Sequence, residues 1–322
     1  MKINDRVYGI VNIDEPVLLK LIQSKPVQRL KRINQAGASQ YAIPGKTVTR
    51  YEHSLGVMIF LHKLGASIEE QIAGLLHDTP HTAFSHVIDF VFQSEEHDFH
   101  EKFYEEIVLN SDIPDILTKY DFSVDTILDD SKFPLLEKNL PDLCADRIDY
   151  SLRDMVARYG YKEKIKEYLE SFIVYDHEIM INDRLIAKRY SEDYLKMDEE
   201  VWSNPLEVAL FYILAEAIKI AIHSDILSEK DLFNDDNFVY EKLKHSGNKE
   251  ILKRLSMISP SLSITDDSEN YDFYTKNKLR YINPKCLYNQ SIKRVSDFFP
   301  DFCLSLEKHN TWIERGFYIR II

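Results

Sequence analysis

The sequence predicts a mainly α-helical fold. Glycine is scarce, at 9 of 322 residues, whereas a typical chain contains about 7% glycine. Apolar residues recur at helical spacing over several long stretches. Residues 172–183 differ, because β-branched and aromatic residues flank a polar turn, which predicts a β-hairpin. We therefore expect a helical core with a helical C-terminal extension and a few short β-hairpin strands.

The first half of the chain is expected to form the core. Apolar and polar residues alternate weakly up to residue 16, which predicts a short extended segment. Helices are then predicted from Pro26 to a C-terminal cap at Gly37, over 50–64, after the capping box formed by Ser67 and Glu70, over 99–109 and over 140–159.

The second half begins with the hairpin. Helices are predicted to return over 191–227, and Ser228 opens a further one. Residues 279–287 and 316–322 are expected to form strands near the C-terminus. At roughly 150 residues per domain, we expect a core over 1–160 and a mainly helical region with short β elements over 161–322, packed on that core.

Composition argues against several classes of protein. The formal charge of −13 would repel the phosphate backbone, so we expect no binding to duplex nucleic acid. The three cysteines are widely spaced, which argues against a disulfide framework and fits a cytoplasmic location. The longest apolar region, 208–222, contains Glu216 and Lys219, and acidic residues interrupt the N-terminal segment. Neither a membrane span nor a signal peptide is expected.

Histidines cluster in a way that predicts a metal site. Imidazole and carboxylate groups are ligands that suit first-row divalent ions. His53 precedes His77 by about one helix, a turn and a second helix, so two antiparallel helices would bring both imidazoles together. Five of the eleven histidines fall between residues 77 and 100: His77, His81, His86, His97 and His100.

The segment over 142–154 supplies acidic candidates. Asp146, Tyr150 and Asp154 are spaced i, i+4, i+8, which keeps them on one stripe of a helix and lets them line a pocket wall. Asp149 and Arg153 are better explained as a supporting ion pair on the adjoining stripe. From spacing alone, the predicted metal ligands are His53, His77, Asp78 and one of Asp142, Asp146 or Asp149.

Four motifs resemble the HD-domain metal-dependent phosphohydrolases: RYEHSLGV at 50–57, GLLHDTPHTAFSH at 74–86, FHEKF at 99–103 and ADRIDYSLRD at 145–154. With INDRVYGIV, PVQRLKRINQAG and YAIPGKTVTRYEHS upstream, the chain is similar to the deoxynucleoside triphosphate triphosphohydrolase branch over residues 3–160. The resemblance implies metal ligation by His53, His77, Asp78 and Asp146, and so selects Asp146 among the aspartates. It implies that His81, Asp89 and His100 act on the phosphates or the attacking water. It further implies contacts to phosphate, base or sugar from Arg50, Gln35, His86, Tyr150 and Asp154.

The resemblance also implies an activity. The expected reaction is metal-dependent hydrolysis of a nucleotide, in this branch of a dNTP to deoxynucleoside plus triphosphate. One divalent ion is expected (Mn, Fe, Ni, Zn or Mg), in a homodimer or higher homo-oligomer. Pro80 and the pair Thr82-Ala83 replace residues of a glycine-rich loop in this branch, so the loop backbone must differ. Arg6-Val7-Tyr8 stands where the branch often has Pro-Ile-His, which argues against nucleotide-regulated oligomerisation.

Three alternatives remain open. One is a phosphomonoesterase or phosphodiesterase of the same superfamily with another substrate. Another is a catalytically silent nucleotide-sensing module, which the retained ligand residues disfavour. The third is an oxidative enzyme in which His81 and His100 bind a second ion.

Overall fold

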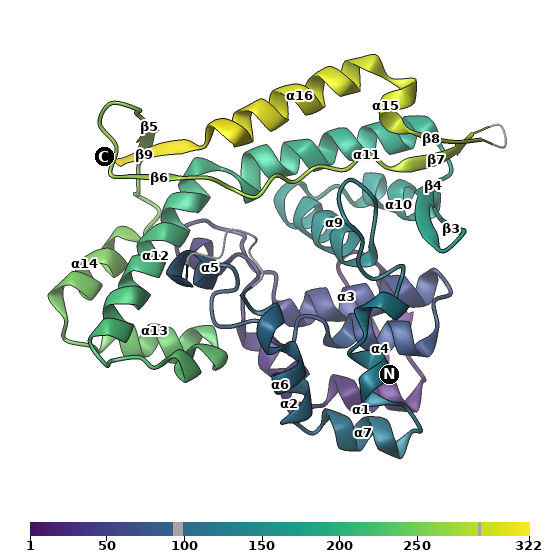
Figure 1. Cartoon of the computed structure of the whole chain (residues 1–322), viewed down its shortest axis with the longest axis horizontal. Helices are drawn as coiled ribbons and strands as arrows, with labels where there is room; N and C mark the ends of the chain where they lie inside the picture. The colour runs from purple at the N-terminus through teal and green to yellow at the C-terminus, as the bar shows by residue number, and fades with distance from the viewer. Residues whose placement is uncertain (93–98, 289–290) are drawn as a thin grey trace.

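The computed structural model describes residues 1–92, 99–288 and 291–322 and is mainly helical, as expected (Figure 1). The α-helices of the described residues are α1 (Pro16–Ile22), α2 (Lys25–Arg29), α3 (Arg50–Lys63), α4 (Ile68–Leu76), α5 (Val87–Phe92), α6 (Tyr104–Leu109), α7 (Ile113–Lys119), α8 (Val124–Ile127), α9 (Ala145–Tyr159), α10 (Lys162–Ser171), α11 (Arg184–Met197), α12 (Pro205–His223), α13 (Asp236–Lys244), α14 (Lys249–Met257), α15 (Val295–Phe298) and α16 (Pro300–Arg315).

Short strands form three small sheets. The strands are β1 (Lys2–Asp5), β2 (Gly9–Asn12), β3 (Phe172–Tyr175), β4 (Glu178–Ile181), β5 (Ile264–Asp266), β6 (Phe273–Thr275), β7 (Lys285–Tyr288), β8 (Ser291–Arg294) and β9 (Phe317–Ile321). Their order is β1-β2, β3-β4-β7-β8 and β5-β9-β6, and every pairing is antiparallel except β4 with β7. The sheet β3-β4-β7-β8 therefore joins the hairpin expected at 172–183 to a strand about a hundred residues later.

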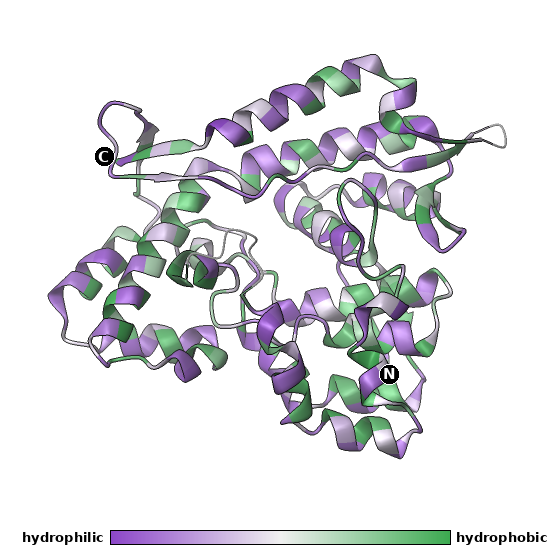
Figure 2. Cartoon of the chain, in the orientation of Figure 1, coloured by the Kyte–Doolittle hydropathy of each residue, from purple (hydrophilic) through white to green (hydrophobic). Residues whose placement is uncertain are grey.

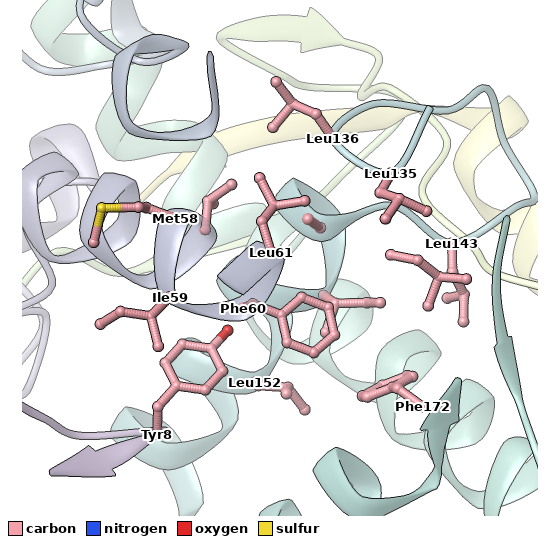
Figure 3. Packing of buried hydrophobic residues seen from close by; sticks show 14 of the residues in the cluster. Tyr8, Met58, Ile59, Phe60, Leu61, Leu135, Leu136, Leu143, Leu152 and Phe172 are labelled. Atoms are coloured by element: carbon pink, nitrogen blue, oxygen red, sulfur yellow. The ribbon is translucent and has the colours of Figure 1, made fainter. Parts of the chain in front are cut away.

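The core lies around α3, which packs against both α4 and α9. Thr49 begins α3 with a full capping box, in which its hydroxyl accepts from the Glu52 amide and the Glu52 carboxylate accepts from the Thr49 amide. Figure 3 shows Phe60 and Leu61 of α3 packed among the leucines that precede α9 and Phe172 of β3. This packing fixes the relative positions of the helices that bear the predicted ligands.

A second apolar cluster forms around α12, which packs against α5 and α14. Figure 2 shows hydrophobic residues over almost all of α5 and along α12. None of the helices within the described ranges combines the length and apolar character needed to cross a bilayer.

Several predicted boundaries were wrong for tertiary reasons. The helix after Pro26 ends in a short 3-10 turn at Arg32. Gly37 does not cap this helix but begins a second 3-10 turn. A Cβ atom at Gly37 would lie 2.6 Å from the Phe84 carbonyl oxygen. The helix predicted over 140–159 begins at Ala145. Ser67 caps α4, but the Glu70 carboxylate accepts from the backbone amides of the loop before α9 instead of completing a capping box.

Gly56 provides the space in which α3 approaches α9. A Cβ at this position would lie 2.0 Å from both the Arg153 Nη2 and the Asp149 Oδ1 atoms, which are locked in a buried ion pair. We expect Gly56→Ala to lower the free energy of unfolding by about 1–3 kcal/mol, despite the better helix propensity of alanine. The control is Gly74→Ala, where the nearest atom is the flexible end of Leu61 at 2.5 Å. Urea unfolding followed by circular dichroism measures both, and a Gly56→Ala protein as stable as the wild type would contradict the packing.

Candidate metal centre

The structure brings the four predicted ligands together from three helices. His53 lies in α3, His77 and Asp78 directly follow α4, and Asp146 lies in the first turn of α9. The Asp146 Oδ1 atom is 2.8 Å from the His53 Nε2 atom and 3.5 Å from the His77 Nε2 atom. The Asp78 Oδ2 atom is 3.9 Å from the His53 Nε2 atom. Donor atoms of His53, His77 and Asp146 all lie within 4.8 Å of one another.

Both histidines present the same ring nitrogen to this point. His53 Nδ1 donates to the Asp149 carboxylate at 2.7 Å, and His77 Nδ1 donates to the Gly74 carbonyl at 2.8 Å. Hydrogen bonds of this kind fix the tautomer and orientation of metal-binding imidazoles. The buried His77 Nε2 atom makes no hydrogen bond to any described residue. An unpartnered buried nitrogen costs free energy unless a ligand uses it, so this donor set fits a divalent cation.

Asp149 supports the site from behind. Its Oδ1 atom accepts from the Tyr8 hydroxyl at 2.8 Å and from the Arg153 Nη2 atom at 2.9 Å, while its Oδ2 atom faces His53. Arg153 also pairs with Asp5 at 3.0 Å, and both partners are almost completely buried. The expected Asp149–Arg153 ion pair is thus present, and it contacts His53, a predicted metal ligand.

Charge in this cluster favours a cation. Burial lowers the pKa of His53, but hydrogen bonds to Asp146 and Asp149 outweigh it and raise that pKa to about 10. Burial is likewise outweighed at His77, whose pKa is raised by the neighbouring carboxylates of Asp78 and Asp146. The carboxylates therefore stabilise positive charge at the point where the imidazoles meet.

A second group of histidines lies beside the first. The rings of His81 and His100 stack with centroids 3.6 Å apart, and the His81 Nε2 atom is 3.2 Å from the Asp78 Oδ1 atom. Burial, together with the Arg50 charge, holds the pKa of His81 well below its usual value. Burial also lowers the pKa of His100, to about 3. Burial therefore disfavours the charged form of both rings. The Nδ1 atom of each lacks a hydrogen-bond partner among the described residues.

Asp89, which was predicted to act with His81 or His100, lies in this group. Its Oδ2 atom lies 2.9 Å from the His86 Nδ1 atom. Its Oδ1 atom accepts from the Phe99 amide at 3.3 Å. His86 was expected to contact substrate, so the structure links a predicted catalytic carboxylate to a predicted substrate-binding imidazole. His97 lies outside the described residues.

The predicted substrate contacts fall on two walls. Arg50 is buried, donating from Nη1 to Asp78 at 3.0 Å and from Nε to the Ser85 hydroxyl at 2.9 Å. Near it, the backbone amide of Gln35 donates to the Val48 carbonyl at 2.9 Å. The Gln35 Oε1 atom is buried and makes no hydrogen bond to a described residue.

Tyr150 and Asp154 form the other wall with two aromatic residues that sequence reasoning did not find. The Tyr150 hydroxyl bonds to the Tyr194 hydroxyl, and its ring centroid lies 5.2 Å from that of Trp202. The Trp202 indole donates to Asp154 at 2.8 Å. The i, i+4, i+8 stripe predicted from Asp146 is therefore an aromatic and acidic surface that extends away from the metal ligands.

The loop over 79–86 is fixed by side chains from distant segments. Arg29 donates from Nη2 to the carbonyls of Thr79 and His81, at 2.7 Å each. Phe84 has a φ of 63°, and its amide donates to Asp236 at 2.7 Å. These contacts stabilise a loop that lacks the glycines of the triphosphohydrolase branch. Arg29 lies in the segment PVQRLKRINQAG, whereas no sequence motif marks Asp236.

Glu137, Cys144 and Asp146 form a second group of possible metal donors. The Arg147 Nη1 atom lies 3.2 Å from the Cys144 Sγ atom. A guanidinium at this position would repel a metal ion. Cys144 is buried, as expected of a small apolar side chain.

Comparison with known proteins agrees with this geometry. The HD domain family model matches residues 50–154. The chain is 41% identical to the uncharacterized protein YdhJ of Bacillus subtilis, with 100% of this chain and 99% of that protein covered. It is 34% identical to the metal-dependent phosphohydrolase cns2 of Cordyceps militaris, over 77% of this chain and 74% of cns2. It is 38% identical to human SAMHD1, a deoxynucleoside triphosphate triphosphohydrolase, over 27% of this chain and 16% of SAMHD1.

A solved structure extends the likeness in fold to the C-terminal half. A hypothetical protein from Aquifex aeolicus superposes with a TM-score of 0.70 at 21% identity, covering 94% of this chain and 93% of that one. The family match spans the helices that carry all four predicted ligands, and the similarity to cns2 continues well beyond them. The chain therefore belongs to the HD-domain metal-dependent phosphohydrolases.

Proposed function

We propose that this protein hydrolyses a phosphate ester of a nucleotide, using one divalent ion held by His53, His77, Asp78 and Asp146. The observation that carries the proposal is the unpartnered, buried His77 Nε2 atom, which lies 3.5 Å from Asp146 among the other three ligands. A divalent ion held there would polarise a phosphoryl oxygen and lower the pKa of its bound water.

The surrounding residues have separate tasks in this proposal. Asp149 orients His53 through its Nδ1–H, and Arg50 orients Asp78. His81 and His100 are neutral, so each can accept a proton or a hydrogen bond from the attacking water or the leaving group. His86 and Asp89 form a coupled pair that can position a phosphate oxygen or relay a proton.

The aromatic wall supports a nucleoside as the non-phosphate part of the substrate. Tyr150 lies one helical turn after Asp146 and packs against Trp202, and both rings are partly exposed, whereas Tyr194 is buried. Asp154 offers a carboxylate suited to a sugar hydroxyl. Resemblance in four motifs favours a dNTP cleaved to deoxynucleoside and triphosphate. A phosphomonoesterase or phosphodiesterase with another substrate is the second candidate. The match to SAMHD1 covers only 27% of this chain, whereas the match to cns2, which is named only as a metal-dependent phosphohydrolase, covers 77%.

The proposal also includes the location of the protein, the size of its substrate and its assembly. Cys144, Cys286 and Cys303 are all free thiols, which fits the reducing cytoplasm. The acidic net charge favours a small-molecule substrate over duplex nucleic acid. We also propose that the protein forms a homodimer or higher homo-oligomer, because the resemblance implies one.

Product analysis tests the reaction. We expect the purified protein, supplied with Mn²⁺ or Mg²⁺, to convert nucleotides to products that chromatography resolves, and Asp146→Ala to lose both bound metal and activity because the ligand is removed. Nucleoside plus triphosphate from dNTPs would support the triphosphohydrolase, and orthophosphate from monophosphates the monoesterase. Exposed Asp125→Asn is the matched control. Inactivity on all substrates with every metal would overturn the proposal in favour of a sensing module.

Asp149 should tune the affinity of the site for metal. We expect Asp149→Asn to weaken metal binding by about 10–100-fold, because it removes the carboxylate that orients His53. The same change leaves the Arg153 charge poorly paired, so thermal unfolding is measured in parallel. Tyr8→Phe removes one neutral hydrogen bond to Asp149 and keeps every charge, so we expect a smaller effect. Unchanged metal affinity in a folded Asp149→Asn protein would contradict this role.

The stacked histidines should affect turnover more than metal content. We expect His81→Ala and His100→Ala to lower kcat by about 10²–10⁴-fold, the range for general acid–base residues, with metal stoichiometry kept at one. Metal analysis by mass spectrometry together with steady-state kinetics separates the two effects. A wild-type stoichiometry of two that drops to one in either variant would instead make these residues ligands of a second ion.

A further inference from the structure

The segment over 276–284 connects β6 to β7 and runs alongside α11 in the view of Figure 1. Two hydrogen bonds fix it to the helices on either side. The Asn277 side-chain amide donates to the Trp202 carbonyl at 3.5 Å, and the His309 Nε2 atom of α16 lies 3.2 Å from the Arg280 carbonyl oxygen. This segment of the C-terminal half is therefore anchored directly to the aromatic wall of the candidate site.

Alternate side chains of this segment have different surroundings. Leu279 and Tyr281 line a cavity of about 440 Å³ under α16, together with Cys303 and Leu306. Lys278 and Arg280 do not line this cavity. The Arg280 Nη1 atom lies instead 3.9 Å from Asp198.

Asp198 links Arg280 to the candidate site. It begins the π-helical turn η5 (Asp198–Trp202), whose last residue packs against Tyr150 and donates to Asp154. Arg280 thus lies at one end of a single turn, and the aromatic wall lies at the other end.

The positive charges of Lys278 and Arg280 act on His86. After burial and the Arg50 charge, the charges of Arg280 and Lys278 contribute to holding the pKa of His86 below its usual value. Positive charge from the C-terminal half therefore acts on the part of the site where an anionic substrate is expected.

Other arginines around the site already use their donors within the protein. Arg50 binds Asp78 and Ser85, and Arg147 binds the Asp142 and Lys138 carbonyls. By contrast, the contacts of the Arg280 guanidinium with described side chains and carbonyls are long: 3.9 Å to Asp198 and 3.5 Å to the Lys278 carbonyl. Asp198 itself is better paired with His309, at 3.0 Å. Most donors of the Arg280 fork are available to an oxyanion.

We propose that Arg280, with Lys278 beside it, binds the phosphate group of the substrate, so that the C-terminal half completes the active site. This assignment rests on the proposed phosphohydrolase function. Arginine suits the task because its planar fork can donate two hydrogen bonds to one phosphate.

The direct test is binding of inorganic phosphate and tripolyphosphate to the metal-loaded protein, measured by isothermal titration calorimetry. We expect Arg280→Gln to raise the Kd of these anions, and the KM of whichever substrate is turned over, by about 10–100-fold, the range for a charge-assisted hydrogen bond. Arg280→Lys should recover part of the affinity. Metal content should stay at the wild-type value, and kcat should change much less than KM.

Two further variants keep the test decisive even where Arg280→Gln fails to fold. Lys278→Gln changes an exposed side chain, so it should fold normally and weaken anion binding by a smaller factor. Lys276→Gln, two residues earlier and also exposed, is the matched control and should bind as the wild type does. Unchanged phosphate affinity in Arg280→Gln and Lys278→Gln, or no anion binding by the wild type, would overturn the assignment. Anion binding that depends on Arg280 in a protein that hydrolyses no nucleotide would reject the proposed function and leave the anion site standing.

Discussion

The buried carboxylate of Asp149 is the constraint on which the site depends. It accepts hydrogen bonds from Tyr8 beside the first hairpin and from Arg153 on its own helix, and it orients His53 of α3. Three elements that are distant in sequence are therefore held by one charge. A buried carboxylate is costly unless it is fully paired, so its partners cannot shift independently. The geometry of the first metal ligand follows from this network.

The same electrostatics divide the site into two halves. Near Asp146 and Asp149 the carboxylates raise the pKa of His53 and His77. Near Arg50, burial and positive charge lower the pKa of His81. One half thus attracts a cation, and the other keeps its imidazoles neutral and able to accept protons. A phosphohydrolase needs both properties within a few ångströms, and here Asp78 lies between the two halves and contacts both.

Local pattern predicted more of the metal site than of the substrate wall. Helical periodicity brought His53, His77 and an acidic helix together, but only the resemblance chose Asp146. The structure gives the physical reason, since α9 begins at Ala145 and leaves Asp142 outside the helix, where it pairs with Arg294. Trp202 escaped prediction because long-range packing brings it to Tyr150 and Asp154, and no local motif marks it. Gly37 was misread as a helix cap for a similar reason. Glycine is needed at this position because the Phe84 carbonyl oxygen, from another segment of the chain, approaches it closely.

The residues that surround the predicted metal ligands come from both halves of the chain. The ligands and neutral histidines lie within residues 50–154, the range that the family model matches. The loop around Pro80, where this chain departs from the glycine-rich pattern, is held by Arg29 and Asp236, which lie outside that range. Trp202 and the segment around Arg280 also lie outside it. Substitutions in these surrounding elements can alter the shape and charge of the substrate wall without disturbing the metal ligands. The motifs within residues 50–154 therefore identify the family of this protein more sharply than its substrate.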